Sequence, residues 1–152
     1  MNVISLDDHL EAQPGTYILV LQAQQPATIN VGRAGMMEVQ PGCYLYTGSA
    51  FGPGGLRGRL AHHLRPVVRP HWHIDYLRQE TSVVEIWAFV GATNLEHDWA
   101  KTLYASPLCA VPMPRFGASD CRCRAHLVFC QARPELTAFQ WSGRLPEICK
   151  RR

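Results

Sequence analysis

The sequence predicts a single α+β domain in which a small central antiparallel sheet is flanked by helices. Three observations lead to this fold class. Short apolar or alternating segments end at glycine or Pro-Gly, leucines recur at helical spacing in later segments, and no repeat or linker interrupts the chain. The chain has 152 residues, about one domain's length, and 47% of them are hydrophobic, which is enough to build a core.

Composition limits where the protein works. No apolar run is long enough to span a bilayer, and the first residues, MNVISLDDHLEAQ, lack the apolar segment of a signal peptide. We therefore expect a cytoplasmic protein with no membrane partner, whose six cysteines are reduced. The net charge of +3 permits a polyanionic partner without requiring one.

The first third of the chain predicts strands. Residues 15–23 (GTYILVLQA) form an apolar run typical of a buried strand, and residues 27–35 (ATINVGRAG) alternate as a partner strand would. A third strand, 44–47, is expected after the Pro41-Gly42 turn. Together these segments predict a small antiparallel meander.

The first predicted helix covers GGLRGRLAHHL, because Leu56, Leu60 and Leu64 are spaced by four and form one apolar face. Arg59 and His63 share a different face. The glycines before this helix match neither a Walker loop nor a dinucleotide fingerprint. We expect them to make room for a nucleic-acid backbone.

The rest of the chain alternates between helix and strand. Residues 71–79 predict a short second helix, residues 83–90 a strand, and residues 93–106 a helix whose apolar stripe is Leu95, Trp99 and Leu103. A turn-rich loop then runs into a final strand, and the basic tail EICKRR is expected to be loosely held.

Several of these segments resemble a known family. The strings GTY, YTG and LRGRLAHH, followed by a glutamate on a later helix, resemble the GIY-YIG nucleases. More narrowly, GTYIL, PGCYLYTGSA, GGL, HWHIDYL and FGASDCRCRAHL resemble the DUF123 branch, or Uri-superfamily endonucleases, over residues 15–129. The last two strings are specific, whereas YTG alone is weak.

The resemblance implies a metal-dependent endonuclease that hydrolyses phosphodiester bonds in DNA, in repair or recombination. Tyr17, Tyr46, Arg59 and His63 would be catalytic, with Tyr17 deprotonating water, helped by His63, and Arg59 stabilising the transition state. Glu96 would hold one Mg²⁺ or Mn²⁺ ion. The sequence does not decide whether the protein also has a protein partner.

The expected contacts with substrate come from six further residues: Gly48, Ser49, Arg57, His73, Ser119 and Arg122. The sequence departs from the family pattern in three ways. Thr16 and Thr47 replace isoleucine in the two motifs, the gap between the motifs is long, as if a hairpin were inserted, and no Pro-x-Tyr-Asn string supplies a late asparagine. Ser119 or Asp120 would stand near that late position.

Two groups allow another interpretation. Thr93 with Glu96 also fits a helix capping box, in which Glu96 would be structural. Cys121, Cys123 and His126 could hold a structural zinc with a fourth ligand from Cys109 or His73. Because Cys-x-Cys is tighter than usual zinc spacings, we expect a buried, reduced cysteine pair there.

The predicted organisation has three parts: a lead segment at 1–14, a nuclease-like domain at 15–132 and a C-terminal extension at 133–152. The alternatives to an enzyme are a non-catalytic nucleic-acid-binding module on the same fold, or a zinc-stabilised adaptor that contacts proteins.

Overall fold

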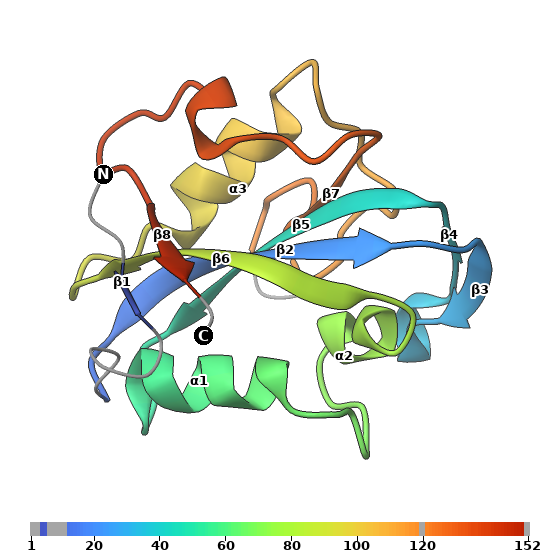
Figure 1. The fold of residues 1–152 in the computed structure, drawn as a ribbon, viewed down its shortest axis with the longest axis horizontal. Helices are drawn as coiled ribbons and strands as arrows, with labels where there is room; N and C mark the ends of the chain where they lie inside the picture. The colour runs from blue at the N-terminus through green and yellow to red at the C-terminus, as the bar shows by residue number, and fades with distance from the viewer. Residues whose placement is uncertain (1–3, 6–11, 119–120, 151–152) are drawn as a thin grey trace.

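The computed structural model describes residues 4–5, 12–118 and 121–150, and it confirms the α+β fold with a central, mainly antiparallel sheet. The sheet has six strands in the order β1-β8-β6-β2-β5-β7 (Figure 1). Their bounds are β1 Ile4–Ser5, β2 Gly15–Ala23, β5 Gly42–Ala50, β6 Ser82–Val90, β7 Leu127–Cys130 and β8 Glu147–Lys150. All neighbours are antiparallel except β1 and β8.

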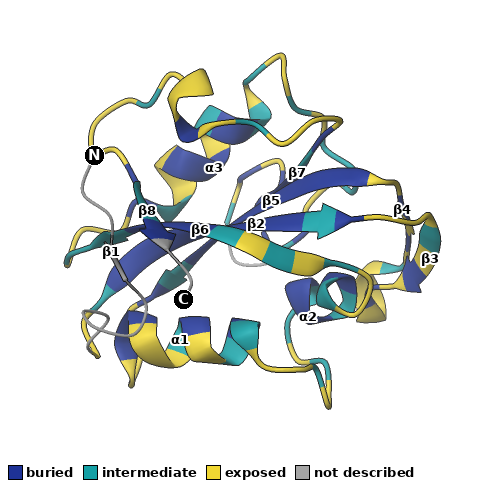
Figure 2. Ribbon diagram, in the orientation of Figure 1, coloured by how far each residue is buried: buried dark blue, intermediate teal, exposed yellow. Residues whose placement is uncertain are grey.

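Strand β2 is central because it pairs with β5 along its whole length on one side and with β6 from Gly15 to Gln22 on the other. It is mostly apolar because both of its faces are covered, and its residues are buried almost without interruption (Figure 2). Alternate residues enter two cores: Tyr17 and Leu19 face one, and Ile18 and Val20 face the other.

The helices occupy both faces of the sheet. Helices α1 (Gly55–Leu64) and α2 (His73–Arg78) pack on one face and α3 (Glu96–Tyr104) on the opposite face (Figure 1). The predicted apolar stripe of α3 is confirmed, since Leu95, Trp99 and Leu103 are all buried. The 3-10 turn η2 (Leu136–Ala138) continues the α3 side of the core.

The meander predicted for the first third is wrong in one respect. Strand β2 pairs directly with β5, whereas β3 (Ala27–Asn30) and β4 (Met36–Val39) form a separate two-stranded sheet. The 3-10 turn η1 (Gly32–Ala34) connects these two short strands. The inserted hairpin inferred from the long gap between the motifs is thus confirmed, and it lies beside α2 (Figure 1).

The loosely held tail is a second correction. Residues of EICK form β8, which pairs with both β6 and β1. Cys149 is buried in the core on the α1 side, so burial and pairing hold a segment whose sequence is charged and short.

Gly55, the first residue of α1, serves the chain's own packing. Gly54 and Gly55 have φ values of 86° and 57°, in the left-handed region that favours glycine. A Cβ on Gly55 would lie 2.4 Å from the backbone oxygen of Gln13, so that space is filled by the protein. The expectation that the glycines of this segment make room for a nucleic-acid backbone is therefore wrong for Gly55; for Gly52, where a Cβ would meet nothing within 4 Å, it stays a prediction.

No helix among the described residues is both long enough and apolar enough to cross a membrane.

Candidate active site

The candidate active site surrounds the end of β5, beyond Tyr46, the last residue that pairs with β7. Arg59, from α1 on one face of the sheet, donates a hydrogen bond to the backbone oxygen of Ser49 at 3.2 Å. Glu96, from α3 on the other face, lies close to the Ser49 side chain, whose influence lowers the pKa of the Glu96 carboxyl group but is outweighed by burial. Side chains from both faces therefore meet around one exposed strand end.

Tyr17 and His63 form the buried centre of this site. The Tyr17 hydroxyl lies 2.7 Å from Nε2 of His63, and both side chains are about 1% exposed. Burial raises the pKa of Tyr17 well above its usual value; the nearby Tyr46 raises it further, and Arg59 lowers it. The Tyr17 phenol is therefore protonated at neutral pH.

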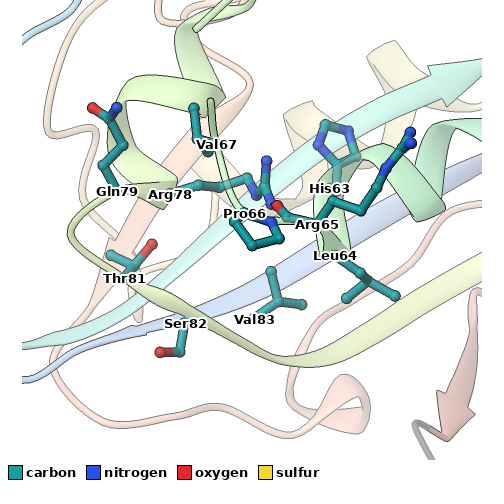
Figure 3. Close-up of a pocket in the computed structure, with 10 residues that line it drawn as sticks. All are labelled: His63, Leu64, Arg65, Pro66, Val67, Arg78, Gln79, Thr81, Ser82 and Val83. Carbon is teal, nitrogen blue, oxygen red and sulfur yellow. The ribbon is translucent and has the colours of Figure 1, made fainter. Parts of the chain in front are cut away.

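His63 is neutral at the same pH. Burial, the largest cause, and the charge of Arg78 lower the pKa of His63 to about 3. His63 and Arg78 line one pocket of about 470 Å³ between α1, α2 and the start of β6 (Figure 3). Tyr46 is also close to His63, with ring centroids 6.4 Å apart, so the two motif tyrosines converge on one histidine.

Because Gly48 has no side chain, it leaves the space that the Tyr17 ring occupies. The two residues are directly opposite each other in the β2–β5 pairing. A Cβ on Gly48 would lie 2.4 Å from the Tyr17 hydroxyl oxygen and 2.5 Å from Cζ. The structure thus assigns Gly48 a packing role beneath Tyr17, whereas the sequence predicts that Gly48 contacts substrate.

We expect Gly48→Ala to lower the free energy of unfolding by about 1–3 kcal/mol, because the added methyl group displaces a buried ring. Urea unfolding measures this. Gly58→Ala is the matched control: its Cβ would enter open space on α1, and it should raise stability by about 0.5–1 kcal/mol. A Gly48→Ala variant as stable as the wild type would contradict this packing role.

Arg59 is oriented by Trp72, a residue that the sequence analysis missed. The guanidinium carbon of Arg59 lies 4.5 Å from the centre of the Trp72 ring. Trp72 also contacts His62 and His63 by ring packing. Nothing in the string HWHIDYL distinguishes an aromatic platform for a distant arginine from an ordinary core tryptophan.

Glu96 does not form the helix capping box with Thr93 that the sequence allows. The residue at the N-cap position of α3 is Leu95, not Thr93, and the Leu95 backbone N–H donates to the Thr16 hydroxyl at 3.0 Å. The Glu96 N–H donates to Asn94 Oδ1. The Glu96 carboxylate is thus left to face Ser49 and the site, and burial raises its pKa.

The remaining predicted substrate contacts are scattered. Arg57 and Arg122 are exposed on α1 and on the loop before β7. His73 uses Nδ1 to accept the backbone N–H of Gly117 at 2.9 Å, which fixes a loop against α2. Ser119 and Asp120 lie outside the described residues.

One group with metal-ligand chemistry, His62, His63 and Asp75, is explained by packing. Asp75 accepts backbone hydrogen bonds from His71 and Trp72 and lies 3.1 Å from His62 Nε2. Burial raises the pKa of Asp75, but these hydrogen bonds outweigh it and the net shift is downward. The carboxylate is therefore engaged in holding the start of α2.

The other group, His97, Cys121, Cys123 and His126, brings its four ligand atoms within 4.8 Å of one another. Neither fourth ligand considered from sequence is used. Cys109 Sγ lies 3.0 Å from Cys130 Sγ, and His73 is bound to Gly117. His97 is the fourth residue, and its distance along the chain from the cysteines hid it.

Comparison with known families adds one finding. A family model described as "Domain of unknown function DUF123" matches residues 16–142, which confirms the resemblance to DUF123. Searches of curated proteins and of solved structures gave no match.

Proposed function

The chain belongs to the DUF123 family, and from that premise we propose that it is a metal-dependent endonuclease of the GIY-YIG type that hydrolyses phosphodiester bonds in DNA. The observation that carries the proposal is the Tyr17–His63 hydrogen bond beside Arg59 and Glu96, around the end of β5. The resemblance of GTY, YTG and the following helix to GIY-YIG nucleases supports the same reaction class.

Arg59 suits the binding of a phosphoryl group. Its guanidinium is held by Trp72 and the Ser49 oxygen, and no carboxylate among the described residues lies within ion-pair distance of it. Its remaining N–H donors can therefore bond phosphoryl oxygens as charge develops there.

Glu96 suits the binding of one divalent cation. Mg²⁺ is commonly held by one or two carboxylates, with waters and substrate phosphates completing its coordination. The partly buried Glu96 carboxylate, facing Ser49 next to Arg59, fits that pattern. A cation bound there would polarise the phosphate and offset charge on the leaving oxygen.

Tyr17 and His63 suit the transfer of one proton. In the tautomer with Nε2 unprotonated, His63 accepts the phenol proton while the Tyr17 oxygen takes a proton from the attacking water. This relay avoids a free tyrosinate, which the raised pKa of Tyr17 disfavours. Asp75 raises the pKa of His63, and so offsets part of the cost of the imidazolium.

The decisive experiment is a cleavage assay with single-stranded, duplex, flapped and branched DNA in Mg²⁺, Mn²⁺ or EDTA. We expect metal-dependent cleavage of at least one substrate, and a rate about 100-fold lower for Tyr17→Phe, which removes only the hydroxyl. Tyr76→Phe, a half-buried tyrosine on α2, is the matched control and should retain full activity.

If the protein binds DNA but cleaves none of the substrates, the proposed enzymatic function is contradicted and the non-catalytic binding module is favoured. Equal cleavage by wild type and Tyr17→Phe would show that the activity does not arise from this site. Binding should also weaken steeply as salt rises, since a phosphate backbone releases counterions when arginines bind it.

A further inference from the structure

Two cysteines and two histidines converge between α3 and the loop before β7. His97 Nδ1 lies 3.3 Å from Cys123 Sγ, and Cys121 Sγ lies 3.3 Å from His126 Nε2. All four ligand atoms lie within 4.8 Å of one another. His97 is exposed, Cys121 is half-buried, and Cys123 and His126 are buried. The cluster therefore lies at the protein surface, with two of its four ligands in the interior.

The backbone around the cysteines is built to hold this arrangement. The Arg115 guanidinium donates to the backbone oxygens of Ala118, Cys121 and Cys123. The Arg115 N–H also donates to the oxygen of Arg124 at 2.6 Å. The guanidinium of the exposed Arg115 thus holds the backbone of the loop that carries both cysteines.

The donor set and its spacing fit one ion. Zn²⁺ binds thiolate at about 2.3 Å and imidazole at about 2.0–2.1 Å, usually with four ligands in a tetrahedron. These bond lengths place neighbouring ligand atoms about 3.4–3.8 Å apart. Two of the observed separations, His97 Nδ1 to Cys123 Sγ and Cys121 Sγ to His126 Nε2, are 3.3 Å, and no pair of ligand atoms is more than 4.8 Å apart, so side-chain adjustments can bring all four around one ion.

We propose that His97, Cys121, Cys123 and His126 bind a structural zinc ion. Two thiolates and two neutral imidazoles make a complex with no net charge, which suits a half-buried position. Four protein ligands leave no open coordination position, so this ion has a structural role and is separate from a cation at Glu96.

His126 connects the proposed zinc site to the candidate active site. With Nε2 facing the ion, Nδ1 carries the proton, and it lies 4.0 Å from Glu96 Oε1. Zinc-bound histidines commonly direct their other N–H at a carboxylate or carbonyl oxygen. The zinc ion would then fix the ring that faces Glu96, and would join the start of α3 to the start of β7.

This inference replaces the reduced cysteine pair expected from sequence. That expectation depended on the lack of a fourth ligand and on the tight Cys-x-Cys spacing. His97 supplies the ligand, and the Arg115-centred loop allows two cysteines only two residues apart to face the same point.

Metal content of the purified protein tests the proposal without any nucleic acid. The chain is prepared without a polyhistidine tag in medium containing zinc, and its zinc, iron, nickel and copper are measured by mass spectrometry. We expect about one zinc per chain in the wild type. Cobalt substitution should give the thiolate-to-cobalt charge-transfer band of a tetrahedral site.

Variants locate the ion. Cys121→Ser with Cys123→Ser, and separately His97→Ala, should each lose most of the zinc, whereas Cys109→Ser and His71→Ala should retain it. His97 and His71 are both exposed, so neither histidine variant threatens folding, and circular dichroism verifies the cysteine variants.

A wild type that is metal-free and shows no cobalt band overturns the proposal, as does full zinc in the cysteine or His97 variants. Full occupancy by another metal overturns the assignment of zinc. None of these outcomes depends on whether the protein cleaves DNA, so failure of the proposed nuclease function and failure of the zinc site are distinguishable.

Discussion

Arg59→Ala is expected to lower the rate of DNA cleavage at saturating substrate by about 10³-fold or more, the scale on which arginines stabilise phosphoryl transfer. The guanidinium is held by the Trp72 ring and by the Ser49 oxygen, so its donors are already aimed before substrate binds. Single-turnover cleavage at saturating enzyme measures the effect on the chemical step.

Two variants sharpen this test. Arg59→Lys keeps the charge but loses the planar fork, so it should recover only a small part of the rate. Arg57→Ala removes an exposed arginine of the same helix, and should weaken binding and flatten its salt dependence while leaving the saturated rate near wild type. Full activity in a folded Arg59→Ala variant would contradict the site.

Glu96→Gln should reduce Mg²⁺-dependent cleavage by about 10³-fold, which corresponds to about 4 kcal/mol of lost transition-state stabilisation. The amide preserves the shape of the side chain but has lost the charge that would hold the cation. Because burial raises the pKa of Glu96, the wild type should also need more Mg²⁺ for half-maximal rate as pH is lowered. Titration of the cleavage rate with Mg²⁺ measures both effects.

Asp98→Asn is the matched control for Glu96→Gln, because Asp98 lies in the same first turn of α3 but is exposed. It should leave the Mg²⁺ titration unchanged. If Glu96→Gln cleaves with the Mg²⁺ dependence of the wild type, the cation is held elsewhere. Zinc measured in the same Glu96→Gln preparation shows whether the proposed structural site survives independently of catalysis.

The elements with strong periodicity could be predicted from sequence. Residues 15–23 and the Leu95-Trp99-Leu103 stripe have patterns that only a buried strand and a one-sided helix satisfy, and both form as expected. Strand β8 could not be predicted, because its four residues carry charge at both ends and are held by pairing with β6. Local propensity does not contain that long-range contribution.

For the candidate site too, residues in local sequence motifs could be predicted, and residues defined by long-range contacts could not. Tyr17, Tyr46, Arg59, His63 and Glu96 were selected because short strings resemble a family, and the structure brings them into one neighbourhood. Trp72 and His97 were missed because their roles depend on contacts through space, with Arg59 and Cys123 respectively. Sequence spacing carries no information about contacts of that kind.

The strand order also determines when each strand edge becomes covered during synthesis of the chain. Strand β2 is synthesised early, but its second edge is closed only by β6, with Gly15 opposite Val90, and β6 is in turn covered by β8 near the end of the chain. Long-range pairings of this type form slowly because a large loop must close first. During synthesis the edge of β2 is therefore uncovered until β6 is made, and the outer edge of β6 is uncovered until β8 is made; such open edges are templates for aggregation.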